Sequence, residues 1–157
     1  MLVVILILAA AVLADVYHLH EVRNFAYGLA ADAAMAGANQ GRDFVGYYGL
    51  RRGELGLGSS AYSTALNVVT EGMTGRGITG YEVIVQVISN PNGGQVQSFP
   101  PVPRAGLAGE SHWTTNGPAV GVYLAVPVQT NLFGLVNGGQ PITVHTFHAA
   151  EVVQVQS

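Results

Sequence analysis

The stretch MLVVILILAAAVLA, Met1 to Ala14, decides the fold because it contains no polar side chain. As an α-helix it would be about 21 Å long at a rise of about 1.5 Å per residue, which is shorter than the ~30 Å hydrocarbon core of a bilayer. A helix that is apolar on every side must be buried in lipid, in a large core or among copies of itself. Because the remaining chain is too small to enclose it, we expect self-association, with a membrane as the place that holds the chain before assembly.

The same stretch could be a secretory signal, since the small-x-small site Val12-Leu13-Ala14 precedes Asp15. A signal requires basic residues ahead of its apolar run, and none is present here. We therefore expect the segment to be retained, either as the front of a longer helix or in a chain whose leader has already been removed.

The helical pattern continues beyond Ala14. No proline occurs between Asp15 and Ala38, and apolar residues recur near the 3.6-residue period. Asn39-Gln40-Gly41 then supplies a stop signal. These features predict one helix over about residues 2 to 38.

Small side chains recur every four residues in the second half of this helix, at Ala26, Ala30, Ala34 and Ala38. Such a strip allows another helix to approach closely. The alternative is that alanine is present only as the strongest helix former. Because the strip adjoins an apolar run, we favour close packing against another copy of the chain. The full set of residues expected at the assembly interface is Leu2, Val3, Ile5, Leu6, Leu8, Val12, Leu13, Asp15, Leu19, Val22, Ala26, Ala30, Ala34 and Ala38.

Asp15 is the first charged residue after the apolar run. A carboxylate in such a setting costs several kcal/mol to bury without a partner. In a packed filament we expect it to meet a cation or an N-terminal amine of a neighbouring copy. The alternative is that Asp15 only marks where the helix leaves the apolar layer. Glu21 and Arg23 do not share a helix face and are expected to pair between subunits or to be solvated.

The rest of the chain, residues 41–157, is predicted to form a small β-rich head behind the hydrophobic segment 1–40. A second helix is expected over about residues 61–72, with Ser59-Ser60 at its start. Alternating apolar residues predict strands, and prolines predict a long loop. The strands are expected at 81–88, 95–99, 120–128 and 142–155, and the loops at 41–58 and 99–118. The fold class is α+β, a long N-terminal helix followed by an antiparallel sheet of three or four strands packed on helix.

Two stretches carry a family resemblance. Val12 to Ala38 reads VLADVYHLHEVRNFAYGLAADAAMAGA, an apolar segment followed by an Asp, an aromatic and arginine patch and an alanine-rich tail. Gly121 to Val153 reads GVYLAVPVQTNLFGLVNGGQPITVHTFHAAEVV, a strand, a loop and a long last strand. Together they resemble the TadE/TadG-like pilins and pseudopilins of the tight-adherence pilus family. The resemblance implies a pilin-like subunit of an extracellular homo-polymeric filament, a membrane-inserted precursor, and a prepilin peptidase and pilus assembly machinery as partners.

One position departs from the pattern of pilins in general. They usually carry a glutamate near the start of the mature helix, where this sequence has Ile5. Either the processing site lies elsewhere, or the charge that pairs with a neighbour's N-terminal amine is missing or replaced. Asp15 is then the candidate replacement.

Composition excludes several other classes of protein. The net charge is −3, and all six basic residues are arginines, of which only Arg51-Arg52 are adjacent, so we expect no nucleic-acid partner. Cysteine is absent, which excludes disulfide frameworks and thiolate sites. Only 10% of the residues are charged, against roughly 25% in a typical soluble domain. Much of the surface should therefore be covered by something other than water.

Catalytic and metal-binding residues are not expected. Side chains of His18 and His20 diverge on a helix, and those of His145 and His148 lie on opposite faces of a strand. We favour structural roles for them, with metal bridging between subunits as the alternative. Ser59-Ser60 lacks a nucleophile motif, so no enzyme and no cofactor is predicted. Two rival hypotheses remain, a membrane-anchored envelope protein or minor pseudopilin that forms no main fibre, and a small secreted hydrolase.

Overall fold

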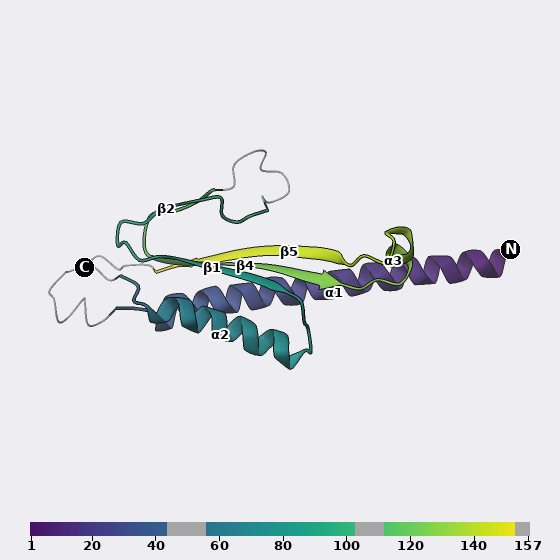
Figure 1. The fold of residues 1–157 in the computed structure, drawn as a ribbon, viewed down its shortest axis with the longest axis horizontal. Coiled ribbons are helices and arrows are strands. Elements are labelled where there is room, and N and C mark those ends of the chain that lie inside the picture. Colours follow the sequence, from purple (N-terminus) through teal and green to yellow (C-terminus); the bar gives the residue numbers. More distant parts are fainter. Residues whose placement is uncertain (44–55, 103–111, 153–157) are drawn as a thin grey trace.

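The predicted long helix is present as α1 (Leu2–Gln40), 39 residues in length. The computed structural model describes residues 1–43, 56–102 and 112–152. Behind α1 the chain forms a second helix, five strands and a short third helix: α2 (Ser60–Gly75), β1 (Glu82–Ile88), β2 (Gly94–Gln97), β3 (His112–Thr115), β4 (Ala119–Val128), α3 (Leu132–Val136) and β5 (Ile142–Glu151). Figure 1 shows these elements gathered along most of α1, while its N-terminal end projects beyond them. The predicted α+β class is confirmed.

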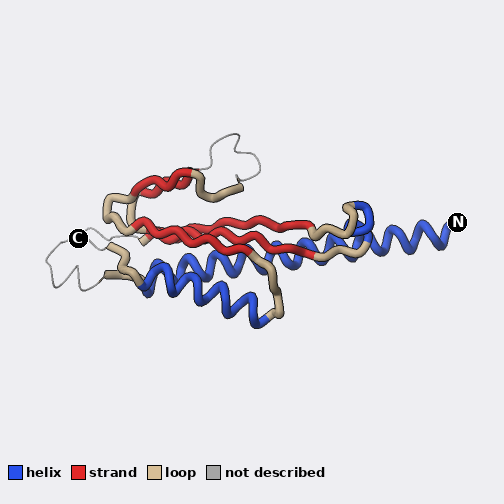
Figure 2. Tube along the Cα trace, viewed as in Figure 1, coloured by secondary structure: helices blue, strands red, loops and turns tan. Residues whose placement is uncertain are grey.

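A three-stranded antiparallel sheet in the order β1-β4-β5 forms the centre of the head. The central strand β4 is buried along almost its whole length. Helices α1 and α2 lie on one side of this sheet, and the two-stranded sheet of β2 and β3 lies on the other (Figure 2). Both faces of β4 are therefore covered, which explains its nearly continuous run of apolar residues.

The main core lies between the sheet and the two long helices. Apolar residues from the second half of α1 pack there with α2 residues such as Val69 and Met73 and with Leu124 of β4. The two helices approach closely at Gly37, where an added Cβ would lie 2.9 Å from the carbonyl oxygen of Ala61. Glycine at position 37 is therefore required by the packing of α2 on α1.

A second cluster covers the outer face of the sheet. The rings of Phe99 and Trp113 lie 5.8 Å apart, and both contact the ring of Phe147 on β5. An added Cβ at Gly121 would lie 2.9 Å from Phe99 and 3.0 Å from Trp113, so the missing side chain makes room for these rings. This aromatic cluster attaches the β2–β3 ribbon to the sheet.

Two predictions of loop structure need correction. The segment 99–118 contains strand β3, whose Trp113 is buried because its ring packs on the sheet. The segment between β4 and β5 contains α3, which was not predicted. The rest of the predicted loops, at 44–55 and 103–111, and the end of the predicted last strand, at 153–155, lie outside the described residues.

Candidate assembly and membrane-contact surface

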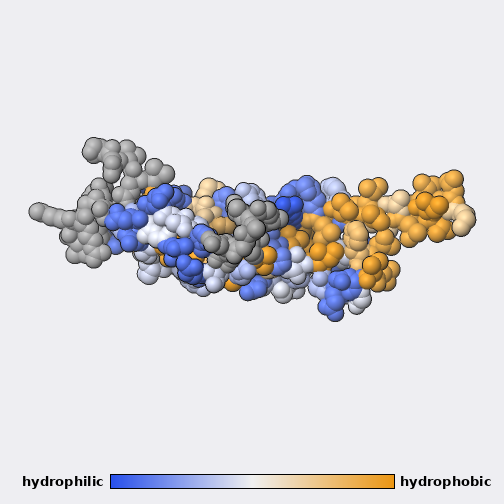
Figure 3. Space-filling view, turned by 90° about the horizontal axis from the view of Figure 1, so that it is seen from above, coloured by the Kyte–Doolittle hydropathy of each residue, from blue (hydrophilic) through white to orange (hydrophobic). Residues whose placement is uncertain are grey.

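The first half of α1 carries the least enclosed apolar surface of that helix. Every residue from Leu2 to Leu8 is exposed, with Leu6 at 60% of its full exposure, and Leu13 is exposed as well. Figure 3 shows apolar residues covering this projecting end on the face in view. Within the described residues, α1 is the one helix long and apolar enough to cross a membrane, judged by length and composition.

Asp15 ends this exposed segment and is itself buried, with 2% of its surface exposed. Its carboxylate lies at the start of α3, on the loop between β4 and β5. Three backbone N–H groups donate to it, from Asn131 at 2.8 Å, Leu132 at 2.7 Å and Phe133 at 3.0 Å. Asp15 thereby satisfies donors of α3 that have no partner within that helix.

This geometry corrects the expected partner of Asp15. The carboxylate is neither solvated at a layer boundary nor left for the amine of a neighbouring copy, because the chain's own α3 occupies it. Hydrogen bonds from N–H groups to a carboxylate are about twice as strong as neutral ones. They join residues 116 to 118 positions apart in the chain. Asp15 therefore fixes α3 against α1 at the point where the helix emerges from the head.

The alanine strip also has a different partner from the one predicted. Ala26, Ala30 and Ala34 are fully buried and Ala38 is 4% exposed, all inside the core formed with α2 and the sheet. The backbone carbonyl of Ala26 accepts a hydrogen bond from Thr146 Oγ1 of β5 at 3.5 Å. Residues enclosed in this way cannot touch a second copy. The interface prediction is therefore wrong for these four alanines, because the head itself uses their small size.

The remaining residues of the predicted interface fall into two groups. Val12, Leu19 and Val22 are half-buried, and Val22 packs against the main core. Six residues are exposed and available to an external partner: Leu2, Val3, Ile5, Leu6, Leu8 and Leu13. The structure thus places the available part of the predicted surface ahead of Asp15.

One charged residue near the middle of α1, Glu21, pairs within the chain. Glu21 Oε1 lies 3.5 Å from Arg76 Nη1 at the end of α2, and both side chains are about half exposed. The guanidinium carbon of Arg76 lies 4.1 Å from the centre of the Phe25 ring. Glu21 was expected to pair between subunits or to be solvated, and instead it makes this contact between α1 and α2.

A groove of about 810 Å³ runs between α1 and β5, with His20, Arg23 and His145 among its lining residues. The Tyr123 hydroxyl and His145 Nδ1 form a 2.8 Å hydrogen bond at its wall. Burial raises the pKa of Tyr123, and the nearby charge of Glu82 raises it further. The ring of His148 packs edge-on against that of Tyr27, and the side chains of His20 and Asn24 are joined by a hydrogen bond. In the described part of the chain no three His, Asp or Glu side chains gather as a metal site.

The surface of functional interest was partly missed by sequence reasoning because α3 was not foreseen. The signal was present as LFGLV, a short apolar run between Asn131 and Asn137-Gly138-Gly139. Asparagine before such a run and glycine after it are typical helix-end residues. Five residues nevertheless form a marginal helix in isolation, so its partner Asp15 could not be inferred without the fold.

Comparison of the chain with protein-family models, with curated proteins and with solved structures found no match.

Proposed function

We propose that this protein is a structural, non-enzymatic subunit of a pilus-like extracellular filament. The subunit polymerises through the projecting segment of α1, residues 1–14, and the filament serves surface attachment. Before assembly, the same segment is held in the inner membrane. The head faces outward in the polymer. No cofactor and no nucleic acid takes part in this function.

The main support for this proposal is that the projecting segment is exposed on all sides of the helix. Seven consecutive large aliphatic residues run from Leu2 to Leu8, and each of them is exposed. Burial of one such side chain contributes roughly 1.5 to 3 kcal/mol, so enclosing the run contributes on the order of 10 kcal/mol. A surface of this kind favours any arrangement that removes it from water.

The distribution of these residues favours a polymer over a dimer. A stripe on one face of a helix can be covered by a single partner, but residues on every face need neighbours on every face. Contacts between unlike surfaces of identical copies close into rings or continue as helical filaments. The projecting end of α1 therefore fits the centre of a bundle made of many copies, with the heads around it.

The likeness of the chain's two ends to tight-adherence pilins supports the same function. This likeness implies two partners for the subunit. A prepilin peptidase would trim the precursor, and a pilus assembly machinery would extract the subunit from the membrane. The length and hydropathy of α1 support a membrane-inserted precursor. Asp15 differs from the glutamate that pilins usually carry near the start of the mature helix, because backbone N–H groups of this chain's own α3 region already bond its carboxylate. Its role is then to shape the subunit and not to pair with the next one.

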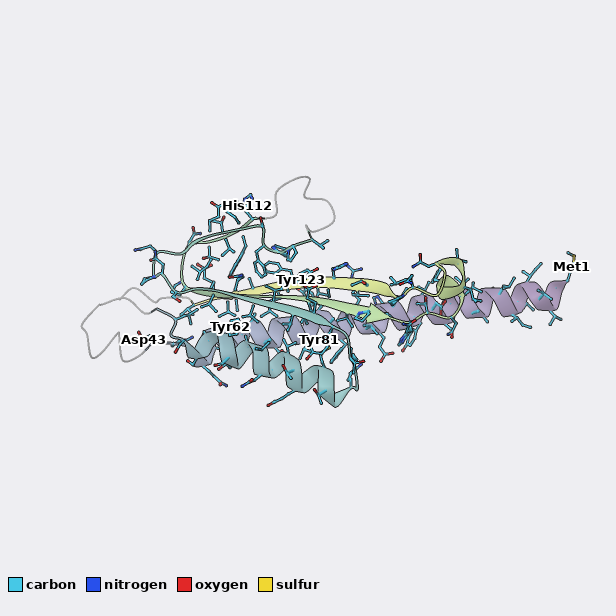
Figure 4. All side chains as sticks on the ribbon, in the orientation of Figure 1. Met1, Asp43, Tyr62, Tyr81, His112 and Tyr123 are labelled. Carbon is cyan, nitrogen blue, oxygen red and sulfur yellow. The ribbon has the colours of Figure 1, made fainter. Side chains whose placement is uncertain are left out.

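The test compares two substitutions at opposite ends of the subunit. Leu6→Asp places a charge in the projecting segment, and Tyr62→Asp places the same charge on α2, where Tyr62 is 50% exposed. Figure 4 shows Met1 at the projecting end of α1 and Tyr62 on α2, well separated along the molecule. In electron microscopy of shed surface material we expect fibres from the wild type and from Tyr62→Asp and none from Leu6→Asp. Fibres from Leu6→Asp, or a monodisperse full-length monomer without detergent, would contradict the proposal.

A second candidate is a membrane-anchored minor pseudopilin or envelope protein that does not form the main fibre. The observation in its favour is that the projecting segment suits a bilayer as well as a bundle of helices. Microscopy of wild-type surface material separates the two, because only a main subunit gives a continuous fibre made of this chain alone.

A further inference from the structure

Helix α3 exposes two aliphatic side chains to an unusual degree. Leu135 is 81% exposed and Val136 is 85% exposed. The sequence from Pro127 to Thr143 around them contains no charged residue, although it includes the connection between β4 and β5. Connections of this kind are ordinarily polar and solvated. The fold does not bury these two side chains, so they are available to a partner outside the chain.

The position of α3 restricts what that partner is. The Asp15 carboxylate holds the first residues of α3, so this helix lies beside α1 where the projecting segment begins. Figure 1 shows α3 next to α1 on the side of the head that faces the N-terminus. In Figure 3 the apolar surface of the projecting end continues into the adjoining part of the head. Any medium that encloses residues 1–14 up to the head therefore reaches α3.

The length of the projecting segment shows why a contact at this level matters in a membrane. Residues 1–14 span about 21 Å as a helix, while a bilayer core is ~30 Å thick. Apolar surfaces that lie in the interface sink about 5 to 10 Å into the boundary between headgroups and acyl chains. If α3 sinks by that amount beside α1, the apolar depth of the subunit reaches about 26 to 31 Å, which matches the bilayer.

Two further features suit this level of a membrane. Tyr17, 71% exposed, lies half a turn beyond Asp15 on α1, and tyrosine is enriched where lipid meets water. The Asp15 charge would otherwise face lipid at a cost of a few kcal/mol. It is instead covered by α3 and bonded to three backbone N–H groups. The subunit can then sit deeper than its first charged residue would allow.

We propose that α3 contacts lipid and places Leu135 and Val136 at the headgroup and acyl-chain boundary of a bilayer. This contact extends the apolar depth of the subunit beyond what residues 1–14 of α1 provide alone. The inference rests on the proposed membrane-inserted precursor. It adds a second point of membrane contact, a long way from α1 in sequence.

The experiment uses tryptophan as a reporter of depth in the full-length protein. Trp113, the one tryptophan of the chain, is replaced by Phe. Single reporters are then introduced as Leu6→Trp, Leu135→Trp and Tyr62→Trp. Each variant is reconstituted into phosphatidylcholine vesicles with plain or brominated acyl chains, and circular dichroism checks that its secondary structure is unchanged. Val136→Trp repeats the measurement next to position 135, in case one reporter perturbs α3.

We expect brominated lipid to quench the reporters at positions 6, 135 and 136 at least about twofold, with blue-shifted emission, and to leave the reporter at 62 unchanged. Quenching at 6 without quenching at 135 and 136 would overturn the contact of α3 with lipid, while membrane insertion of α1 would stand. Absence of quenching at all positions would overturn both. A blue shift at 135 in lipid-free protein that rises with protein concentration, without quenching by brominated lipid, would assign the surface to a second copy and overturn the lipid contact.

Discussion

The two halves of α1 contain apolar residues in opposite environments. The first half is rich in leucine, isoleucine and valine and the second in alanine, and together they form one helix without proline. Leu6 in the first half is 60% exposed, whereas Leu29 in the second half is 9% exposed. The difference arises because α2 and the sheet cover the second half only. Whether an apolar residue of α1 is buried therefore depends on how far the head extends along the helix.

Asp15 lies in the first half of α1, at the point where the helix emerges from the head. Residues 1–10 ahead of it are exposed, and the first α1 residue that packs against the main core behind it is Val22. The carboxylate stabilises this part of the molecule because it ties the loop between β4 and β5 to the helix. One part of α1 thus serves to stabilise the subunit, and the other is left for partners of the subunit.

The largest effect is expected from one substitution made in both halves, Leu29→Ala and Leu6→Ala. Leu29 packs on α2, where its side chain fills the space that an added Cβ at Gly72 would need. Removal of a buried leucine side chain leaves a cavity and costs about 2 to 5 kcal/mol. Leu29→Ala should therefore lower the free energy of unfolding of the head by that amount. Urea denaturation in a mild non-ionic detergent, followed by the fluorescence of the buried Trp113, measures it.

Leu6→Ala is the matched control, because it deletes the same atoms from the same helix. The unfolding free energy of the head should change by less than about 0.5 kcal/mol, as is usual for exposed positions. Equal losses from the two variants would mean that the projecting half is part of the folding unit, and the contrast between the halves would be lost.

A smaller and more local effect is expected from Asp15→Ala. Three backbone N–H groups at the start of α3 would lose their acceptor, and loss of a capping side chain costs up to about 2 kcal/mol. Hydrogen exchange of the amides of Asn131, Leu132 and Phe133 should become faster, while the amides of β4 stay protected. Asp15→Asn keeps an acceptor oxygen without the charge and should show an intermediate effect. Unchanged exchange at these three amides in Asp15→Ala would show that other contacts hold α3.

Much of this contrast could be predicted from the sequence. Local signals decide a long helix, so the apolar run, the absence of proline and the stop at Asn39-Gln40-Gly41 were enough to place α1. The alternation of apolar residues placed β1, β4 and β5 in the same way. The exposure of residues 2–8 also followed, because the remaining chain is too short to enclose a helix that is apolar on all sides.

The partners of particular residues could not be predicted, because they depend on contacts between distant parts of the chain. A strip of small residues indicates close packing but not the element that packs. Here it is the chain's own sheet and α2 that enclose Ala30 and Ala34. The partner of Asp15 lies more than a hundred residues away, in a helix too short to give a clear local signal. Trp113 reads as part of a proline-rich loop until the sheet that it covers is known.

The smallest effect is expected at Gly28, which lies in the half of α1 that the head covers but faces away from the head. An added Cβ there meets nothing within 4 Å, whereas one at Gly37 would lie 2.9 Å from the Ala61 carbonyl. Glycine inside a helix is about 1 kcal/mol less favourable than alanine. Gly28→Ala should therefore raise the unfolding free energy by up to about 1 kcal/mol, and Gly37→Ala should lower it. Urea denaturation at low protein concentration measures both, and destabilisation by Gly28→Ala would show that this face of α1 is covered by a neighbour and is not open.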